Sequence, residues 1–516
     1  MKAKGRKLKQ HLSRARFGGE LLVSLPLDVL ELVCSSLTLD DTVALTSCCR
    51  RLWTRPDVTD SERLWGALEA DFKYKTAYVS RSHAVSLSHW LARHKAAVSR
   101  LSLLGYRDGF NPARVLTGLG GVPLASLELR QMDAIGANPA RALAPLAHLG
   151  GLTKLRLQDC DVQRLPRQLS ALTALEVLDI VNYREGDGVR PAAFAVLAAL
   201  TQLTAVRLER CGLRQLPQQL SALAASLRLL GLPVNYSLGN AVVGNMCPLH
   251  SLSALTNLDM SCCGLPRVPP QLSAMGLLHQ LRLSDNGMAG ARPNSWEPLR
   301  RLTCLTLLDL AECQLEYLPQ QLSCLTALAE LVLSGNRDLG PFLDGGGPAA
   351  AQAQPEGAEE SNWQPLLSLD ASLTSLDMCE CNIAALPAEL SSLSALMKLD
   401  LSNNVELGLV AGTAFQPLSG LVGLEMLGLN ALALRCIPPQ LKALPALKEL
   451  QVWGNRSLGD EGPALGEQLL ELSTLKRLDL GYDFEVHSST EEVLELMRGR
   501  GVSISSPGVS DWDWDN

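Results

Sequence analysis

The chain has 516 residues, of which 47% are hydrophobic and only 4% aromatic, and its formal net charge is −7. This length exceeds that of an ordinary single domain, so it indicates either several domains or a repeat array. The mild net charge gives no support to a function in nucleic-acid binding or to an acidic substrate.

The first 19 residues carry seven Lys or Arg side chains and no acidic one. We interpret residues 1–20 as a solvated, disordered basic tail; a nuclear address and a contact with an acidic surface are the alternatives. No apolar segment of secretory-signal length follows, and no later run approaches the roughly 18 residues needed to span a bilayer. We therefore expect a soluble protein of the cytoplasm or nucleus without a membrane partner.

Residues 21–70 have the pattern of a small helical domain. Pro26 follows Leu25 at an expected helix start, and apolar residues continue at helical spacing through Leu37. Asp40 or Asp41 can cap a second helix, and a third piece follows. So small a helical unit buries too little area to fold alone, so it should lean on a partner or on the rest of the chain. Residues 71–97 are expected to form a helical linker and cap.

Four short motifs give residues 21–70 a family resemblance. They are Leu25-Pro26-Leu27-Asp28-Val29-Leu30, Asp40-Asp41, Cys49-Arg50-Arg51-Leu52-Trp53 and Leu64-Trp65-Gly66-Ala67-Leu68. The segment resembles an F-box, although Thr46-Ser47 stands where that family commonly has apolar residues. The resemblance implies docking on a Skp-type adaptor, and through it on a cullin. The adaptor-binding candidates are Leu25, Pro26, Val29, Leu30, Leu32 and Val33.

From residue 98 to residue 501 the sequence repeats one frame. The stretch LTKLRLQDCDVQRLPRQLSALTA, which starts at Leu152, has close copies at Leu203, Leu255, Leu305 and Leu373, with a longer relative between successive copies. Repeat lengths alternate near 23 and 28 residues. The leucine alternation predicts a strand buried on one face, and the L-P-x-Q-L segment predicts a helical or irregular return.

The frame resembles the leucine-rich repeat, L-x-x-L-x-L-x-x-N/C-x-L. The resemblance implies an α/β fold, a leucine-rich-repeat solenoid with a parallel concave sheet, preceded by the small all-α F-box-like domain. Residues 341–363 interrupt the frame with a Gly-, Pro- and Ala-rich insertion, which we expect to be a flexible loop. Residues 502–516 are expected to form an acidic C-terminal tail.

One position of the frame is Cys in short repeats and Asn in long ones. The side chain there should point inward where the strand ends and backbone groups lose their ladder partners. Equivalent cysteines lie two strands apart, roughly 10 Å, which exceeds the reach of a disulfide. We interpret the thiols as buried structural groups. Because no ligand or catalytic motif accompanies them, we expect no metal, no cofactor and no enzymatic activity. The positions are Cys160, Cys211, Cys263, Cys313 and Cys381, and Asn235, Asn286, Asn336, Asn404 and Asn455.

Strand residues between the buried leucines should form a column on the concave face. In early repeats this column alternates in sign, as at Arg156 and Asp179, so neighbouring charges can neutralise one another. Later it becomes acidic, and Lys398 is the nearby cation. We expect this acidic part to bind a basic segment of a protein partner, with an aromatic anchor; an ordinary exposed surface is the alternative. The candidates are Asp377, Glu380, Asp400 and Trp453.

The two resemblances imply a non-catalytic substrate-recognition subunit of a cullin-based (Skp-cullin-F-box) ubiquitin ligase. The F-box docks on the adaptor and the repeats bind an unknown target protein. The alternative is a leucine-rich-repeat scaffold in cytoskeletal or ciliary assembly or in signalling. Neither function involves nucleic acid, and the assignment rests on family analogy because a fold alone does not fix function.

Overall fold

A computed structural model describes residues 67–71, 99–105, 112–162, 164–182, 191–240, 243–288, 292–340, 362–409, 413–458, 465–481 and 488–505. The chain divides into two compact units, Met1–Gly231 and Leu232–Asn516. The six candidate adaptor-binding residues and the basic tail lie outside the described residues, as do residues 341–361 and 506–516.

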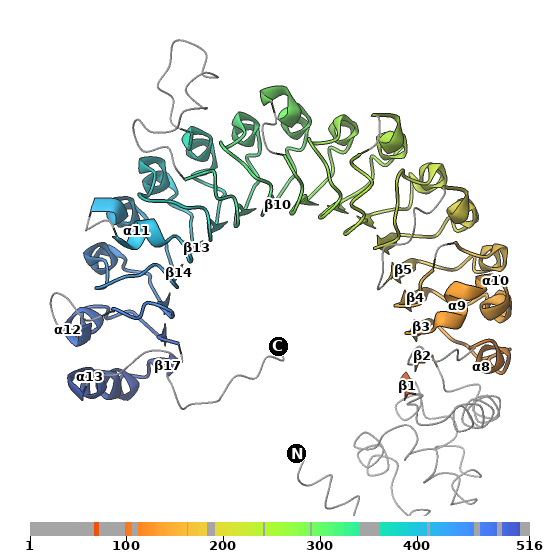
Figure 1. Ribbon diagram of the computed structural model, residues 1–516, viewed down its shortest axis with the longest axis horizontal. Helices are drawn as coiled ribbons and strands as arrows, with labels where there is room; N and C mark the ends of the chain where they lie inside the picture. The colour runs from red at the N-terminus through yellow and green to blue at the C-terminus, as the bar shows by residue number, and fades with distance from the viewer. Residues whose placement is uncertain are drawn as a thin grey trace, which may run out of the picture. The chain divides into compact units, whose positions relative to one another are not determined.

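In the first unit the strands run parallel, and each pairs with the next along the chain (Figure 1). Short helices return the chain along the opposite face. The strands are β1 (Ala67–Asp71), β2 (Arg100–Leu104), β3 (Ser126–Arg130), β4 (Lys154–Gln158), β5 (Val177–Val181), β6 (Ala205–Glu209) and β7 (Leu229–Gly231). The helices are α8 (Ala113–Thr117), α9 (Asp133–Ala137), α10 (Pro139–Ala142), η2 (Ala144–His148), η3 (Arg167–Ala171), η4 (Pro191–Ala199) and η5 (Gln218–Leu223).

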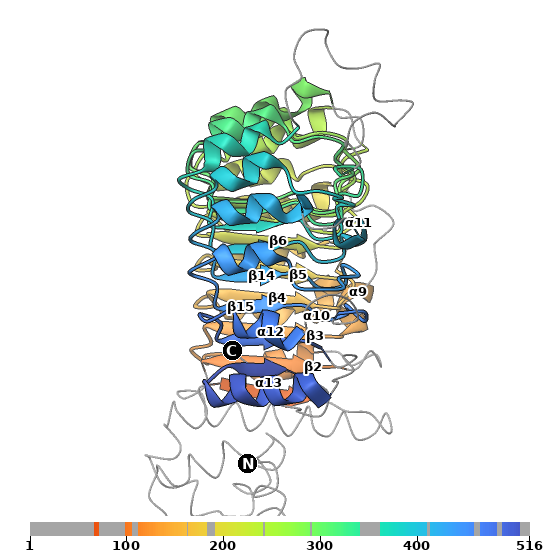
Figure 2. The ribbon, with the colours of Figure 1, turned by 90° about the vertical axis from the view of Figure 1, so that its left-hand side faces the viewer.

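The second unit repeats this arrangement with shorter strands, stacked in parallel and seen side on in Figure 2. The strands are β8 (Asn257–Asp259), β9 (Gln280–Arg282), β10 (Leu307–Asp309), β11 (Glu330–Val332), β12 (Ser375–Asp377), β13 (Lys398–Asp400), β14 (Met426–Gly428), β15 (Glu449–Gln451), β16 (Arg477–Asp479) and β17 (Ser503–Ser505). The helices are η6 (Val243–Ser251), η7 (Pro270–Ala274), η8 (Pro293–Arg301), η9 (Gln320–Cys324), η11 (Gln364–Leu369), η12 (Ala388–Ser392), α11 (Val405–Leu409), η13 (Thr413–Gly420), η14 (Pro439–Ala443), α12 (Leu465–Leu470) and α13 (Ser488–Gly499).

The two ends of the repeat array differ from their expected bounds. Residues 67–70, expected to close the helical domain, lie in β1, because pairing with β2 satisfies their backbone groups. The remainder of the expected helical domain and its linker lies outside the described residues, up to residue 98. At the other end β17 pairs with β16 beyond residue 501, and its Ile504 is buried. The sheet therefore extends into the segment expected to be a tail.

Most return segments are 3₁₀ helices rather than α-helices. In η3 the Leu169 N–H bonds the Pro166 carbonyl, 3.1 Å away, and the other short repeats begin the same way after a proline. Each of these helices spans only five residues, little more than one turn, and i→i+3 bonds suit so short a piece. The expectation of a helical or irregular return is thus met by the tighter helix.

The Asn positions form a buried hydrogen-bond ladder. The Asn404 side-chain oxygen accepts from the backbone N–H groups of Cys381 and Ile383, each at 3.0 Å. Its Nδ2 donates to the carbonyls of Met378 and Leu401, at 2.8 and 2.7 Å. Asn286 and Asn455 make the same four bonds in their own repeats. Each amide thus satisfies backbone groups of two successive repeats at once.

The Cys positions fill the alternate steps of this ladder. All five are fully buried and free of disulfides. The Cys381 thiol donates to the Leu333 carbonyl of the preceding repeat at 3.2 Å. Cys263 and Cys313 likewise each donate to a carbonyl of the repeat before their own. Burial raises the pKa of Cys313 and of Cys381 to about 12. The thiols are therefore protonated, unreactive filling, as the sequence spacing indicated.

Most turns out of the sheet use left-handed backbone next to the ladder residue. In short repeats both neighbours of the ladder residue have positive φ, as at Ala431 and Ala433 around the buried Leu432. Most of these positions are not glycine, although non-glycine residues disfavour this region. The array therefore holds local strain that the surrounding hydrogen bonds maintain.

Replacing Ala433, at φ 58°, by glycine is expected to stabilise the protein by about 0.5–1 kcal/mol, because the left-handed conformation loses its steric cost. The matched control is Ala443→Gly, at the exposed end of η14, which should destabilise instead. Urea unfolding followed by circular dichroism measures both. Destabilisation by Ala433→Gly would show that Ala433 packing outweighs the backbone strain.

Candidate interaction surface

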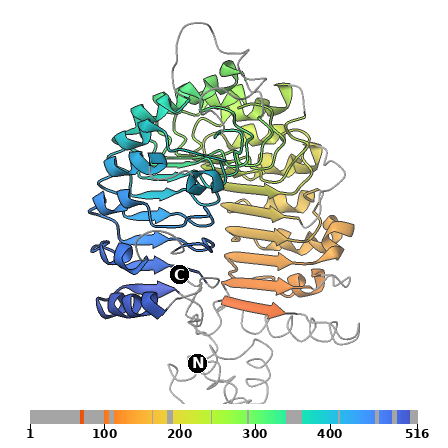
Figure 3. The same cartoon turned by 60° about the vertical axis from the view of Figure 1, so that its left-hand side comes forward.

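The concave face of the second unit presents a column of strand side chains. Figure 3 shows the strands from which they project, running parallel within the unit. Register places Arg282 beside Asp309, Val332 beside Asp377, and Asp377 beside Asp400. The column thus becomes acidic at β12 and β13, in agreement with the frame.

The aspartates of this column also end their strands. The Asp377 carboxylate accepts the Cys379 backbone N–H, and Asp400 accepts that of Ser402, both at 2.9 Å. Asp259, Asp309 and Asp479 bond the N–H two residues on in the same way. An aspartate directly followed by a leucine or methionine and then a small residue is the signal for this turn. These carboxylates are consequently held in fixed positions on the surface.

The neighbouring pair of Asp377 and Asp400 carries uncompensated negative charge. Burial raises the pKa of Asp377 above its ordinary value, the Cys379 N–H lowers it, and the Asp400 carboxylate raises it again. Within the described residues no Lys or Arg forms an ion pair with either carboxylate. A cation supplied from outside would remove this repulsion.

Gly428, which has no side chain, leaves a notch in the surface beside Asp400. A Cβ on Gly428 would lie 2.5 Å from the Asp400 side-chain oxygen, so the carboxylate occupies the space that a side chain would fill. Beyond this notch Trp453 is 46% exposed, and its backbone N–H bonds the Asn430 side chain at 3.1 Å. Asp400 on β13 is two strands from Gln451 on β15, roughly 10 Å, and Trp453 lies two residues past the end of β15.

Glu380 differs from the other three candidates, because Arg337 forms an ion pair with it. Arg337 follows the ladder residue of the preceding repeat and lies across the insertion in sequence, so the frame gave no sign of this pair. The structure therefore groups Asp377, Asp400 and Trp453 around the Gly428 notch and leaves Glu380 neutralised at one side. We call the first three residues with Gly428 the acidic notch.

The concave face of the first unit is neutralised internally. Arg156 lies 3.2 Å from Asp179 and 3.6 Å from Glu128, on the two flanking strands. Arg207 pairs instead with Glu209 on its own strand, at 2.7 Å. The sign alternation of the early column thus produces ion pairs, and uncompensated charge is confined to later repeats of the column.

Asp377→Asn is expected to stabilise the protein at pH 7 and to leave its stability unchanged at pH 3. The folded-state pKa lies above the unfolded one, so the cost of ionisation grows as pH rises from about 3.9 through the folded pKa. Asparagine keeps the acceptor for the Cys379 N–H but carries no charge. The gain at pH 7 should be about 0.5 kcal/mol, since solvent screens a half-buried group.

Urea midpoints at the two pH values measure this effect, and Asp370→Asn, exposed on the helical face, is the control with the parental midpoint at both. Equal effects of Asp377→Asn at pH 3 and pH 7 would show that ionisation of the Asp377 carboxyl is not the cause.

The described residues show neither a metal-binding cluster nor a membrane-spanning helix. Among them, no three His, Cys, Asp or Glu side chains are arranged to hold a metal ion. None of the described helices combines the length and apolar character that crossing a bilayer requires.

Comparison with known proteins identifies the architecture. No protein-family model matches the sequence, and no curated protein matches it significantly. Among solved structures, TLR13 in its complex with ssRNA13 superposes with a TM-score of 0.53 at 18% identity, over 83% of this chain and 60% of that one. The chain has the leucine-rich-repeat fold. The expected leucine-rich-repeat solenoid is thereby confirmed, and the F-box-like domain stays a prediction.

Two further structures are similar at lower scores. A leucine-rich-repeat protein of Leptospira interrogans gives a TM-score of 0.49 at 17% identity, over 84% of this chain and 99% of that one. The functional domain of InlJ from Listeria monocytogenes, which includes a cysteine ladder, gives 0.44 at 16% identity, over 76% and 69%. This leucine-rich-repeat chain spans less than two thirds of the TLR13 chain.

Proposed function

We propose that the leucine-rich repeats bind a target protein through the acidic notch. The observation that carries this is the in-register pair of Asp377 and Asp400, half-buried and without a described cation partner. Such a pair weakens the free protein, and a Lys or Arg of a target inserted beside it would gain charge-assisted hydrogen bonds. Trp453 offers that target an aromatic contact of the kind enriched at the centre of interfaces.

The finer assignment is a substrate-recognition subunit of a Skp-cullin-F-box ubiquitin ligase. It rests on the four motifs between Leu25 and Leu68, which resemble an F-box. In this arrangement the adaptor takes the N-terminal segment and the repeats take the target. Ligation chemistry belongs to other subunits, and this chain contributes proximity between target and ubiquitin donor.

A scaffold without adaptor binding is the second candidate. It is favoured by the repeats themselves, which form a continuous binding surface in each unit irrespective of the N-terminal segment. A scaffold of this kind holds its partners together through surfaces alone, with the acidic notch as one of them. The two candidates differ in a single property, dependence on the adaptor.

One experiment with two variants separates them. We expect Leu25→Ser/Pro26→Ser to reduce recovery of the Skp-type adaptor at least tenfold in affinity purification, while target proteins are still recovered. Asp377→Lys/Asp400→Lys should reduce recovery of target proteins and leave recovery of the adaptor unchanged. It reverses the charge of the acidic notch and leaves the N-terminal segment intact. Quantitative mass spectrometry of co-purifying proteins reads both.

The matched control is Leu367→Ser, which makes an exposed leucine on the helical face polar and should change neither recovery. Absence of the adaptor from the parent sample, with targets still lost on charge reversal, selects the scaffold. Unchanged recovery of targets by Asp377→Lys/Asp400→Lys contradicts the acidic notch as the binding surface.

A further inference from the structure

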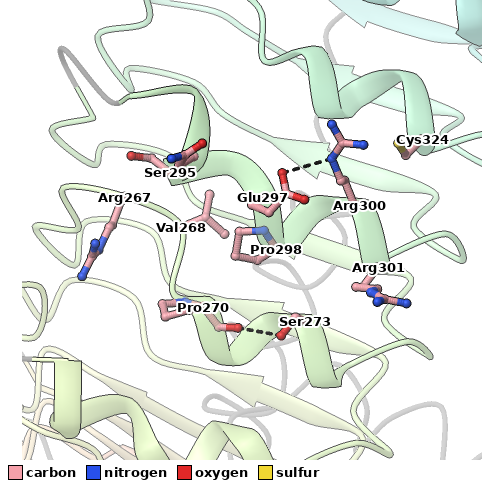
Figure 4. Close-up of a pocket in the computed structure, with 11 residues that line it drawn as sticks. Arg267, Val268, Pro270, Ser273, Ser295, Glu297, Pro298, Arg300, Arg301 and Cys324 are labelled. Atoms are coloured by element: carbon pink, nitrogen blue, oxygen red, sulfur yellow. Dashed lines mark hydrogen bonds and ion pairs between the residues drawn. The ribbon is translucent and has the colours of Figure 1, made fainter.

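A second surface, on the helical side of the second unit, is hollowed and basic. A groove of about 610 Å³ lies between η7, η8 and η9. Figure 4 shows Arg267 toward one end of it and Arg300 and Arg301 toward the other, with Val268 and Pro298 between them. Val268 and Pro298 are buried, so the floor is apolar and the exposed guanidinium groups form the rim.

The charge of this groove is only partly balanced. Glu297 accepts from Arg300 Nε at 3.0 Å and from the Gln321 amide at 3.4 Å, so its carboxylate is already held. Among the described residues no carboxylate pairs with Arg267 or Arg301. The complementary ligand is therefore an acidic segment with apolar side chains for the floor, and arginine also stacks on aromatic rings.

This chain contains a segment of that chemistry, Asp511-Trp512-Asp513-Trp514-Asp515. In an extended conformation successive side chains point to opposite sides, so the two Trp residues share one face and the three Asp residues the other. With the Trp side chains on the apolar floor, the Asp carboxylates lie on the solvent side of the segment, where the long, exposed arginine side chains of the rim can reach them. The acidic notch repels the same segment, which leaves the basic groove as the favoured site.

Geometry requires the segment to come from another molecule. Eight strand steps of about 4.8 Å separate β9 from β17, about 38 Å along the sheet, and the groove lies on the longer outer side. Residues 506–510 span at most about 18 Å when fully extended. We propose that the basic groove binds residues 511–516 of a second copy of this chain. The inference does not depend on the adaptor or on the target.

A labelled peptide of residues 506–516 is the probe, titrated into the full chain by fluorescence anisotropy. Arg267→Glu/Arg301→Glu should weaken its binding about tenfold or more, because two attractive contacts become repulsive. Arg456→Glu/Arg500→Glu makes the same charge change at exposed sites away from the groove, and should bind as the parent does. A peptide with both Trp residues replaced by Ala should bind more weakly than the natural one.

Self-association of the full chain is the second measurement, by analytical ultracentrifugation. We expect concentration-dependent association that is lost on Trp512→Ala/Trp514→Ala and on Arg267→Glu/Arg301→Glu, and regained when these two variants are mixed, since each supplies the half that the other lacks. Equal peptide binding by parent and Arg267→Glu/Arg301→Glu overturns the groove as the site. A chain that stays monomeric well above the peptide dissociation constant overturns the second copy as the occupant.

Discussion

Gly408→Ala is expected to lower the free energy of unfolding by about 3 kcal/mol, although alanine is the better helix former. A Cβ at this position in α11 would lie 1.9 Å from the Leu432 carbonyl oxygen of the next repeat. Helix propensity favours alanine by about 1 kcal/mol, but backbone on both sides of the contact cannot yield without separating the repeats.

The same contact recurs in other long repeats. Twelve residues after the first leucine, Gly136, Gly239 and Gly340 each approach a carbonyl of the following short repeat, where a Cβ would lie 2.1–2.7 Å from oxygen. Gly276→Ala is the control, because nothing lies within 4 Å of its Cβ position, and it should stay within about 0.5 kcal/mol of the parent. Urea unfolding measures both, and equal values for the two variants would refute the close-packing argument.

Asn404→Leu is expected to lower the free energy of unfolding by about 4 kcal/mol. Cys381→Ala, a substitution at the other kind of ladder position, should have the smaller effect. Leucine has a similar size but leaves two backbone N–H groups and two carbonyls without their partners. Each unpaired buried group costs about 1–3 kcal/mol, and local relaxation recovers part of the total.

Cys381→Ala tests the other kind of ladder step. The thiol makes weak bonds to carbonyls only, so its loss should cost about 1 kcal/mol for the small cavity. Denaturant midpoints of the two variants, compared at equal slope, decide the matter. A cost for Cys381→Ala that matches Asn404→Leu would mean that packing, and not backbone satisfaction, sets the identity of this position.

The regular part of the fold could be predicted from sequence because one period governs it. Leucine alternation fixes which face of each strand is buried, and the frame places every Cys and most Asn ladder residues. Asn182 was not predicted as a ladder residue, because in its repeat the ladder position comes one residue early. It is nevertheless buried, and its side chain accepts the Val162 N–H at 2.9 Å. A frame of fixed spacing cannot register a turn that is one residue shorter.

The candidate site was predictable in its charges but not in its shape. Register follows from the frame, so the neighbouring positions of Asp377 and Asp400 were foreseen. The notch at Gly428 depends on the side-chain conformation of Asp400, and the Arg337–Glu380 ion pair joins residues on either side of the insertion. Both are set by side-chain conformations and by a turn, neither of which has a periodic signature.

The glycine contacts have a consequence for how such a chain can change in length. A long repeat presents its glycine to a short one, and short repeats begin at Leu152, Leu203 and Leu255, steps of 51 and 52 residues. Removing one repeat alone would place two long repeats, or two short repeats, next to each other. The glycine of a long repeat would then face the turn of another long repeat, which does not match it. Growth and loss of this array should therefore proceed in doublets, and a designed deletion of residues 203–254 should preserve folding where deletion of either half does not.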